Sequence, residues 1–135
     1  MEPRLFSHAE LQGTCYAEFS PGAEGYACFW SKDSVYLEME AFEATDRLVG
    51  HFNLFGPVTL SGSRLQKCID DLLAAAKRVS QAESPEDVWD PAYCPFLEIE
   101  DWQQERRQFS IMLRDLAKWM RHVQARKQPV TCNGL

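Results

Sequence analysis

Carboxylates are the most abundant side chains in this 135-residue chain that can do chemistry. Residues 35–42 alternate in the manner of a β-strand, and on such a strand Glu38 and Glu40 point the same way. Neighbouring carboxylates repel each other, which can raise the pKa of one of them and suit it to acid–base catalysis. An exposed sheet face produces the same spacing without any chemistry, so both interpretations stay open.

The stretch 83–101 contains seven acidic residues and no basic one, with aromatic residues between them. In one interpretation it is a polar loop whose aromatic side chains fill the core between two helices. In the other, Trp89 and Tyr93 anchor a protein partner and the acids guide it electrostatically. The candidate partner-binding residues come from this stretch and from the acidic run before it: Glu38, Glu40, Glu43, Asp46, Glu86, Asp87, Trp89, Asp90 and Tyr93.

The histidines and cysteines lack the spacing that a metal or nucleophile site needs. His8, His51 and His122 fall on three different expected elements, and the chain has no Cys-x-x-Cys or His-x-x-x-His pair. A thiolate pair would need Cys15 or Cys94 beside His51, and no local signature supports one. The chain also has no Gly-rich phosphate loop and no G-x-S-x-G elbow. We expect no metal, no cofactor and no catalytic residue.

The cysteines and the N-terminal residues indicate in which cellular compartment the protein is expected. Five cysteines at irregular spacing do not suggest a disulfide framework. The first residues lack the apolar core and the small-residue cleavage site of a secretory signal. No apolar run approaches the roughly 18 residues of a membrane span. We expect reduced thiols, a cytoplasmic location and no membrane association.

Charge is spread unevenly along the chain. The net charge is −6, and residues 1–60 alone carry nine acids and three bases. Residues 101–135 carry three acids and seven bases, so the basic end is expected to neutralise the acidic body, within one molecule or across a dimer. An acidic body disfavours nucleic-acid binding, which depends on Lys and Arg. It favours a basic protein partner, met by a monomer or a homodimer.

The first half of the chain predicts a sheet. Short connections between successive strands imply an antiparallel meander, because parallel crossovers need longer links. Gly50 falls inside the last strand candidate and suggests a bulge there. The four strand candidates are 14–19, 26–30, 35–42 and 47–55.

The second half predicts two long helices. Apolar residues at three- and four-residue spacing mark one helix over 63–82, where Ser63 and Gln66 form a capping box. Asp101 caps the other, which runs to about Lys127. We therefore predict one α+β domain over 1–135, a four-stranded antiparallel meander followed by two long helices packed on one face. At the poorly determined ends, 1–13 holds at most a helical turn around His8 to Leu11, and 128–135 is expected to fray.

This layout resembles the small acidic immunity proteins that bacteria pair with toxins. The resemblance lies in the meander over 15–55, in the helices that start at Ser63 and Asp101, and in the two acidic clusters. These families share no signature, so no residue roles carry over. The resemblance implies a protein that neutralises a toxin by occluding its basic active-site cleft.

Two other functions fit the same sequence. A chaperone for a secreted effector is also small and acidic, but it needs exposed apolar grooves and is an obligate dimer. A small enzyme or ligand-binding module would use carboxylates in a cleft between sheet and helices, lined by aromatic residues. The aromatic candidates for such a lining are Trp30, Tyr36, Phe42 and Trp89.

Overall fold

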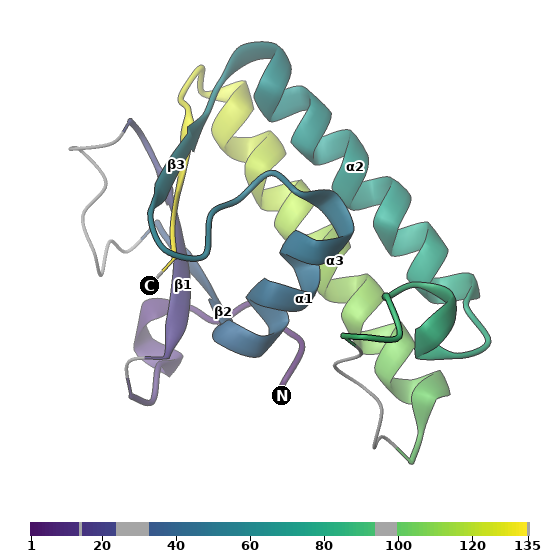
Figure 1. Ribbon diagram of the computed structural model, residues 1–135. Coiled ribbons are helices and arrows are strands. Elements are labelled where there is room, and N and C mark those ends of the chain that lie inside the picture. The colour runs from purple at the N-terminus through teal and green to yellow at the C-terminus, as the bar shows by residue number, and fades with distance from the viewer. Residues whose placement is uncertain (14, 24–32, 94–99, 135) are drawn as a thin grey trace.

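A sheet and two long helices make up most of the computed structural model, which describes residues 1–13, 15–23, 33–93 and 100–134 (Figure 1). The helices α2 and α3 lie against one face of the sheet, and the shorter α1 lies beside them. None of the described helices is long and apolar enough to cross a bilayer. The elements in chain order are η1 (His8–Glu10), β1 (Tyr16–Pro21), β2 (Val35–Glu38), α1 (Met39–Val49), β3 (Pro57–Leu60), α2 (Gly62–Gln81), η2 (Pro85–Asp87), α3 (Trp102–Ala125) and β4 (Val130–Asn133).

The sheet has four antiparallel strands in the order β2-β1-β4-β3. The α+β class, the antiparallel sheet and the two long helices are therefore confirmed. The connections are not those of a meander, because β4 follows both long helices and lies between β1 and β3. The C-terminal residues are thus a central strand and not a frayed end. Val130 and Cys132 face the core and are buried, but a four-residue segment carries too short a pattern to reveal this.

Helix α1 takes the place of the second half of the strand expected over 35–42 and of the start of the strand expected over 47–55, whose remaining residues form neither helix nor strand. The alternation holds only through β2, and the residues that follow bury a helical face: Ala41, Phe42, Ala44 and Thr45. Gly50 adopts a left-handed conformation (φ 71°), and its amide donates to the Asp46 carbonyl, so it ends the helix and forms no bulge. The expected strand over 26–30 lies outside the described residues.

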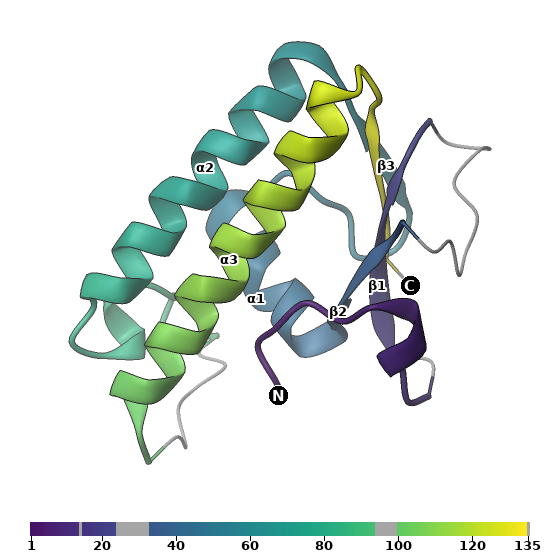
Figure 2. The same cartoon turned by 180° about the vertical axis from the view of Figure 1, so that it is seen from behind.

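Helices α2 and α3 form an antiparallel hairpin (Figure 2). The Asp101 carboxylate accepts the Gln104 amide at 3.1 Å, which confirms the expected cap of α3. The capping box expected at Ser63 is wrong, because α2 begins one residue earlier and the Gln66 side chain donates to Asp70 instead. The apolar stripes of both helices are buried between the hairpin and the sheet.

Candidate functional site

Glu38 and Glu40 lie at the junction of β2 and α1, not along one strand as expected. Glu38 ends β2, and its Oε2 accepts the backbone amide of Glu2 at 2.9 Å. Glu40 lies in the first turn of α1, with its Oε2 3.6 Å from the amino group of Met1. Each carboxylate thus has its own cationic or N–H partner.

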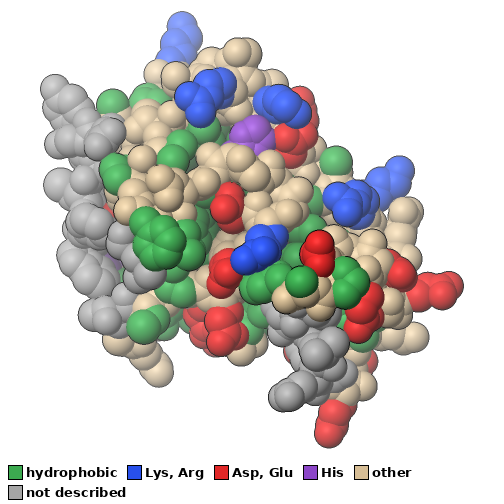
Figure 3. Space-filling model, in the orientation of Figure 1, with side chains coloured by type: hydrophobic (Ala, Val, Ile, Leu, Met, Phe, Trp, Pro, Cys, Tyr) green, Lys and Arg blue, Asp and Glu red, His purple; other side chains and the backbone are tan. Residues whose placement is uncertain are grey.

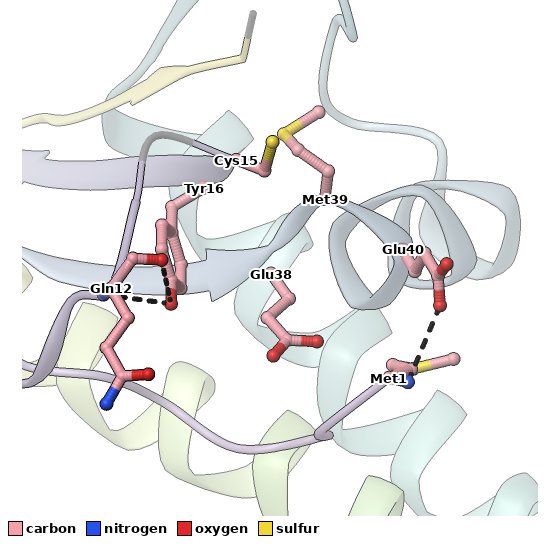
Figure 4. A pocket seen from close by; sticks show the side chains of 7 residues that line it. All are labelled: Met1, Gln12, Cys15, Tyr16, Glu38, Met39 and Glu40. Atoms are coloured by element: carbon pink, nitrogen blue, oxygen red, sulfur yellow. Dashed lines mark hydrogen bonds and ion pairs between the residues drawn. The ribbon is translucent and has the colours of Figure 1, made fainter.

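A hollow of about 270 Å³ opens at this junction. Figure 4 shows the Glu38 side chain between Tyr16 and Glu40, with Cys15 and Met39 on the other side of the β2–α1 turn. The Tyr16 hydroxyl donates to the Gln12 carbonyl at 3.3 Å, which closes one side. The residues around the hollow are Met1, Gln12, Cys15, Tyr16, Glu38, Met39 and Glu40.

The other two acids of α1 have structural partners. Glu43 forms an ion pair with Arg47 one turn later, at 3.3 Å. Asp46 is half-buried, and its Oδ1 accepts the Phe52 amide at 3.0 Å. Burial raises the pKa of Asp46, and this hydrogen bond opposes the rise. Asp46 therefore stabilises the end of α1, and it is less available than an exposed acid for contact with a partner.

Trp89 lies in the core. Only 3% of its surface is exposed, and its ring packs edge-on against Trp102 and Phe109. Its Nε1 donates to the Ala44 carbonyl at 3.0 Å. Trp89 thus fills the interior, as in the first of the two interpretations of the 83–101 stretch, and does not lie where a partner would meet it.

These contacts join α1 to the segment after α2. Besides the hydrogen bond from Trp89, the Arg47 guanidinium stacks on the Tyr93 ring at 4.0 Å. On the surface in Figure 3, acidic side chains gather over α1 and over this segment. We call the resulting surface the acidic face and define it by Glu40, Glu43, Glu86, Asp87 and Asp90.

The described thiols differ in exposure. Cys15 is exposed, whereas Cys68 and Cys132 are buried. Burial raises the pKa of the Cys68 thiol to about 12 and that of Cys132 well above its usual value, so both stay protonated core side chains. Cys28 and Cys94 lie outside the described residues. His51 bonds Asp71, and no group of three described His, Cys, Asp or Glu residues is arranged to hold a metal ion.

Strand β1 carries a buried carboxylate, Glu18, that the sequence analysis did not single out. Glu18 alternates with the core residues Ala17 and Phe19 of β1, yet only 1% of its own surface is exposed. Its carboxylate accepts the Tyr36 hydroxyl at 2.7 Å and the Asn133 amide at 3.4 Å. The Asn133 contact depends on β4 being central, which no local pattern indicates.

No family model matches this chain, and searches of curated proteins and of solved structures also find no match.

Proposed function

We propose that this protein is an inhibitor that binds another protein through its acidic face and covers a basic cleft, as toxin-immunity proteins do. The observation that carries the proposal is the joining of two acidic segments by the Trp89–Ala44 hydrogen bond, whose partners are 45 positions apart in sequence. Each segment alone carries only two or three of these acids. Together they make a negative surface that a phosphate-binding cleft attracts.

Rigidity of the supporting elements favours binding. The acids of the face lie on α1, on η2 and just after η2, and the buried Trp89 ring fixes these elements to each other. A surface that is ordered before binding loses less conformational entropy on association. Tyr93, half-buried under Arg47, is the aromatic residue of this region that a partner would reach.

The exposed apolar side chains do not favour the chaperone. An extended client needs a continuous apolar groove. In the part of the chain that the structure describes, the large exposed apolar residues lie on separate segments: Met1, Phe55 on the loop before β3, and Ile111 on α3. The acidic face is therefore the better supported contact surface.

The test compares two double variants with equal change in net charge. Glu40→Lys with Glu86→Lys reverses charge on the acidic face, and Asp70→Lys with Asp115→Lys reverses exposed acids on α2 and α3. A basic partner is first captured from a lysate of the source organism at low salt and purified. At low salt, we expect the association rate of the first variant with this partner to fall about tenfold or more. The control variant should keep the wild-type rate.

The purified partner also allows the proposed inhibition to be measured. Its activity should fall to zero at a one-to-one ratio with the wild-type protein, and the association rate should fall as salt rises. Equal association rates for both variants, or a bound partner that stays fully active, would show that the proposal is wrong. Capture of no basic protein by the folded wild type would contradict it as well.

A further inference from the structure

A second hollow, of about 280 Å³, lies between α2 and α3 at the end of the hairpin where α2 finishes and α3 begins. The Ser110 hydroxyl donates to the Ala76 carbonyl at 2.9 Å and ties the two helices together at its base. We call it the basic hollow, and it is lined by Ser80, Gln103, Arg106, Arg107, Ser110, Ile111 and Arg114.

Among the described residues, the lining contains three guanidinium groups and no carboxylate. Arg107 and Arg114 are seven residues apart on α3, which places them on the same side of the helix, about 10 Å apart along its axis. Gln103 precedes Arg107 by one turn and adds an amide donor. Arg106 is held at the edge, where its Nη1 donates to the Ala82 carbonyl at 2.6 Å.

Two of these guanidinium groups have no close anionic partner among the described residues. Arg107 and Arg114 form no ion pair or hydrogen bond with a described residue, although the chain contains twenty acids. The expected pairing of the basic C-terminal helix with the acidic body is therefore not seen: among described residues, no cation of α3 pairs with an acid. Gathering like charges in one hollow costs free energy that a bound anion would recover.

We propose that the basic hollow binds a small phosphorylated ligand whose phosphate oxygens bridge Arg107 and Arg114. A guanidinium presents a planar fork of N–H donors that matches phosphate oxygens in two-point contact. The volume suits a small molecule and not a polymer strand. The exposed side chain of Ile111 offers an apolar contact for the rest of the ligand. This site lies on other elements than the acidic face, so it does not depend on the proposed inhibitor function.

Inorganic pyrophosphate is the first probe, titrated into the full chain by calorimetry at an ionic strength held constant with sodium chloride. We expect saturable one-to-one binding and a rise in melting temperature. The double variant Arg107→Ala with Arg114→Ala should lose about tenfold or more in affinity, because charge-assisted two-point contacts are removed. The control, Lys118→Ala with Arg121→Ala, removes the same charge from exposed positions of α3 outside the hollow and should keep the affinity.

Arg107→Lys keeps the charge and removes the fork, so its affinity should fall between those of the wild type and the double variant. Circular dichroism verifies that each variant is folded. No saturable binding of pyrophosphate by the folded wild type would overturn the proposal. Equal loss in both double variants would also overturn it, since that result marks diffuse attraction to the whole helix. The Glu40→Lys with Glu86→Lys variant should bind pyrophosphate like the wild type, which separates this test from that of the acidic face.

Discussion

At the scale of single residues, one ionic cluster links the end of α1 to α2. Asp71 on α2 lies 2.7 Å from Nε2 of His51, which follows α1, and 3.1 Å from Nζ of Lys67. The hydrogen bond to His51 and then that to Lys67 lower the pKa of Asp71. The ionised form of the Asp71 carboxylate is therefore more stable in the native protein than in the unfolded chain. That stabilisation is present above the unfolded pKa, near 3.8, and is lost as pH falls through the lower native value.

Asp71→Asn should reduce the free energy of unfolding at pH 7 by about 0.5–1 kcal/mol, the range for partly exposed ion pairs. The difference from the wild type should shrink as pH falls below about 4, because the carboxylate is protonated first in the unfolded chain and, at still lower pH, in the native protein as well. Urea unfolding followed by tryptophan fluorescence at several pH values measures this. Asp70→Asn is the matched control, because Asp70 is exposed and, among the described residues, bonds only the Gln66 side-chain amide. A difference in free energy of unfolding between the wild type and Asp71→Asn that stays constant down to pH 3 would show that the ionised Asp71 does not stabilise the fold.

At the scale of elements, the end of β4 passes very close to the loop before β3. A Cβ atom on Gly134 would lie 2.6 Å from the Asn53 carbonyl oxygen, and closer still to that of Leu54. Both obstacles are backbone atoms, which cannot rotate away as a side chain can. Glycine is therefore required at this position by a close approach of two chain segments.

Gly134→Ala should destabilise the protein by about 1–3 kcal/mol, as overpacking does, because β4 or the loop must shift. Gly56→Ala lies in the same region and serves as the control, since its added Cβ meets only the Asn53 side chain at 3.5 Å. Thermal unfolding of both variants gives the comparison. Equal melting temperatures for the two variants would show that the loop moves freely.

The elements that the sequence predicted well are those with long local patterns. The apolar stripes of α2 and α3 extend over many turns, so their period is clear, and Asp101 caps α3 as expected. Helix α1 was missed because Val35, Leu37 and Met39 alternate across the junction where β2 ends and the helix begins. The acidic residues of the candidate site were identified, but their grouping was not, because it depends on a hydrogen bond between Trp89 and Ala44.

At the scale of the whole molecule, the C-terminal strand holds the sheet together. β4 is the only described link between β3 and the β1–β2 pair. The Thr131 hydroxyl on β4 strengthens this link, because it bonds the Thr59 hydroxyl at 3.0 Å and donates to the Gly22 carbonyl at 2.7 Å. Without β4, a two-stranded ribbon and a separate single strand remain, and neither is stable alone in water.

A chain truncated after Lys127 should therefore lose cooperative unfolding and its near-ultraviolet circular dichroism, while the helical hairpin leaves part of the far-ultraviolet signal. A synthetic peptide covering residues 128–135, added in excess, should restore both signals by occupying the place of β4. A truncated chain that unfolds with the wild-type midpoint would show that β4 is dispensable.

The position of β4 also sets the order in which a nascent chain can assemble. Until β4 is made, its place between β1 and β3 is an empty slot, and the amide and carbonyl groups with which these two strands will pair to β4 have no partner. Any extended segment that reaches the slot first competes with β4, including the same strand from a neighbouring chain. Slow synthesis or crowding of unfinished chains would thus favour strand-exchanged dimers, because β4 is made after both long helices.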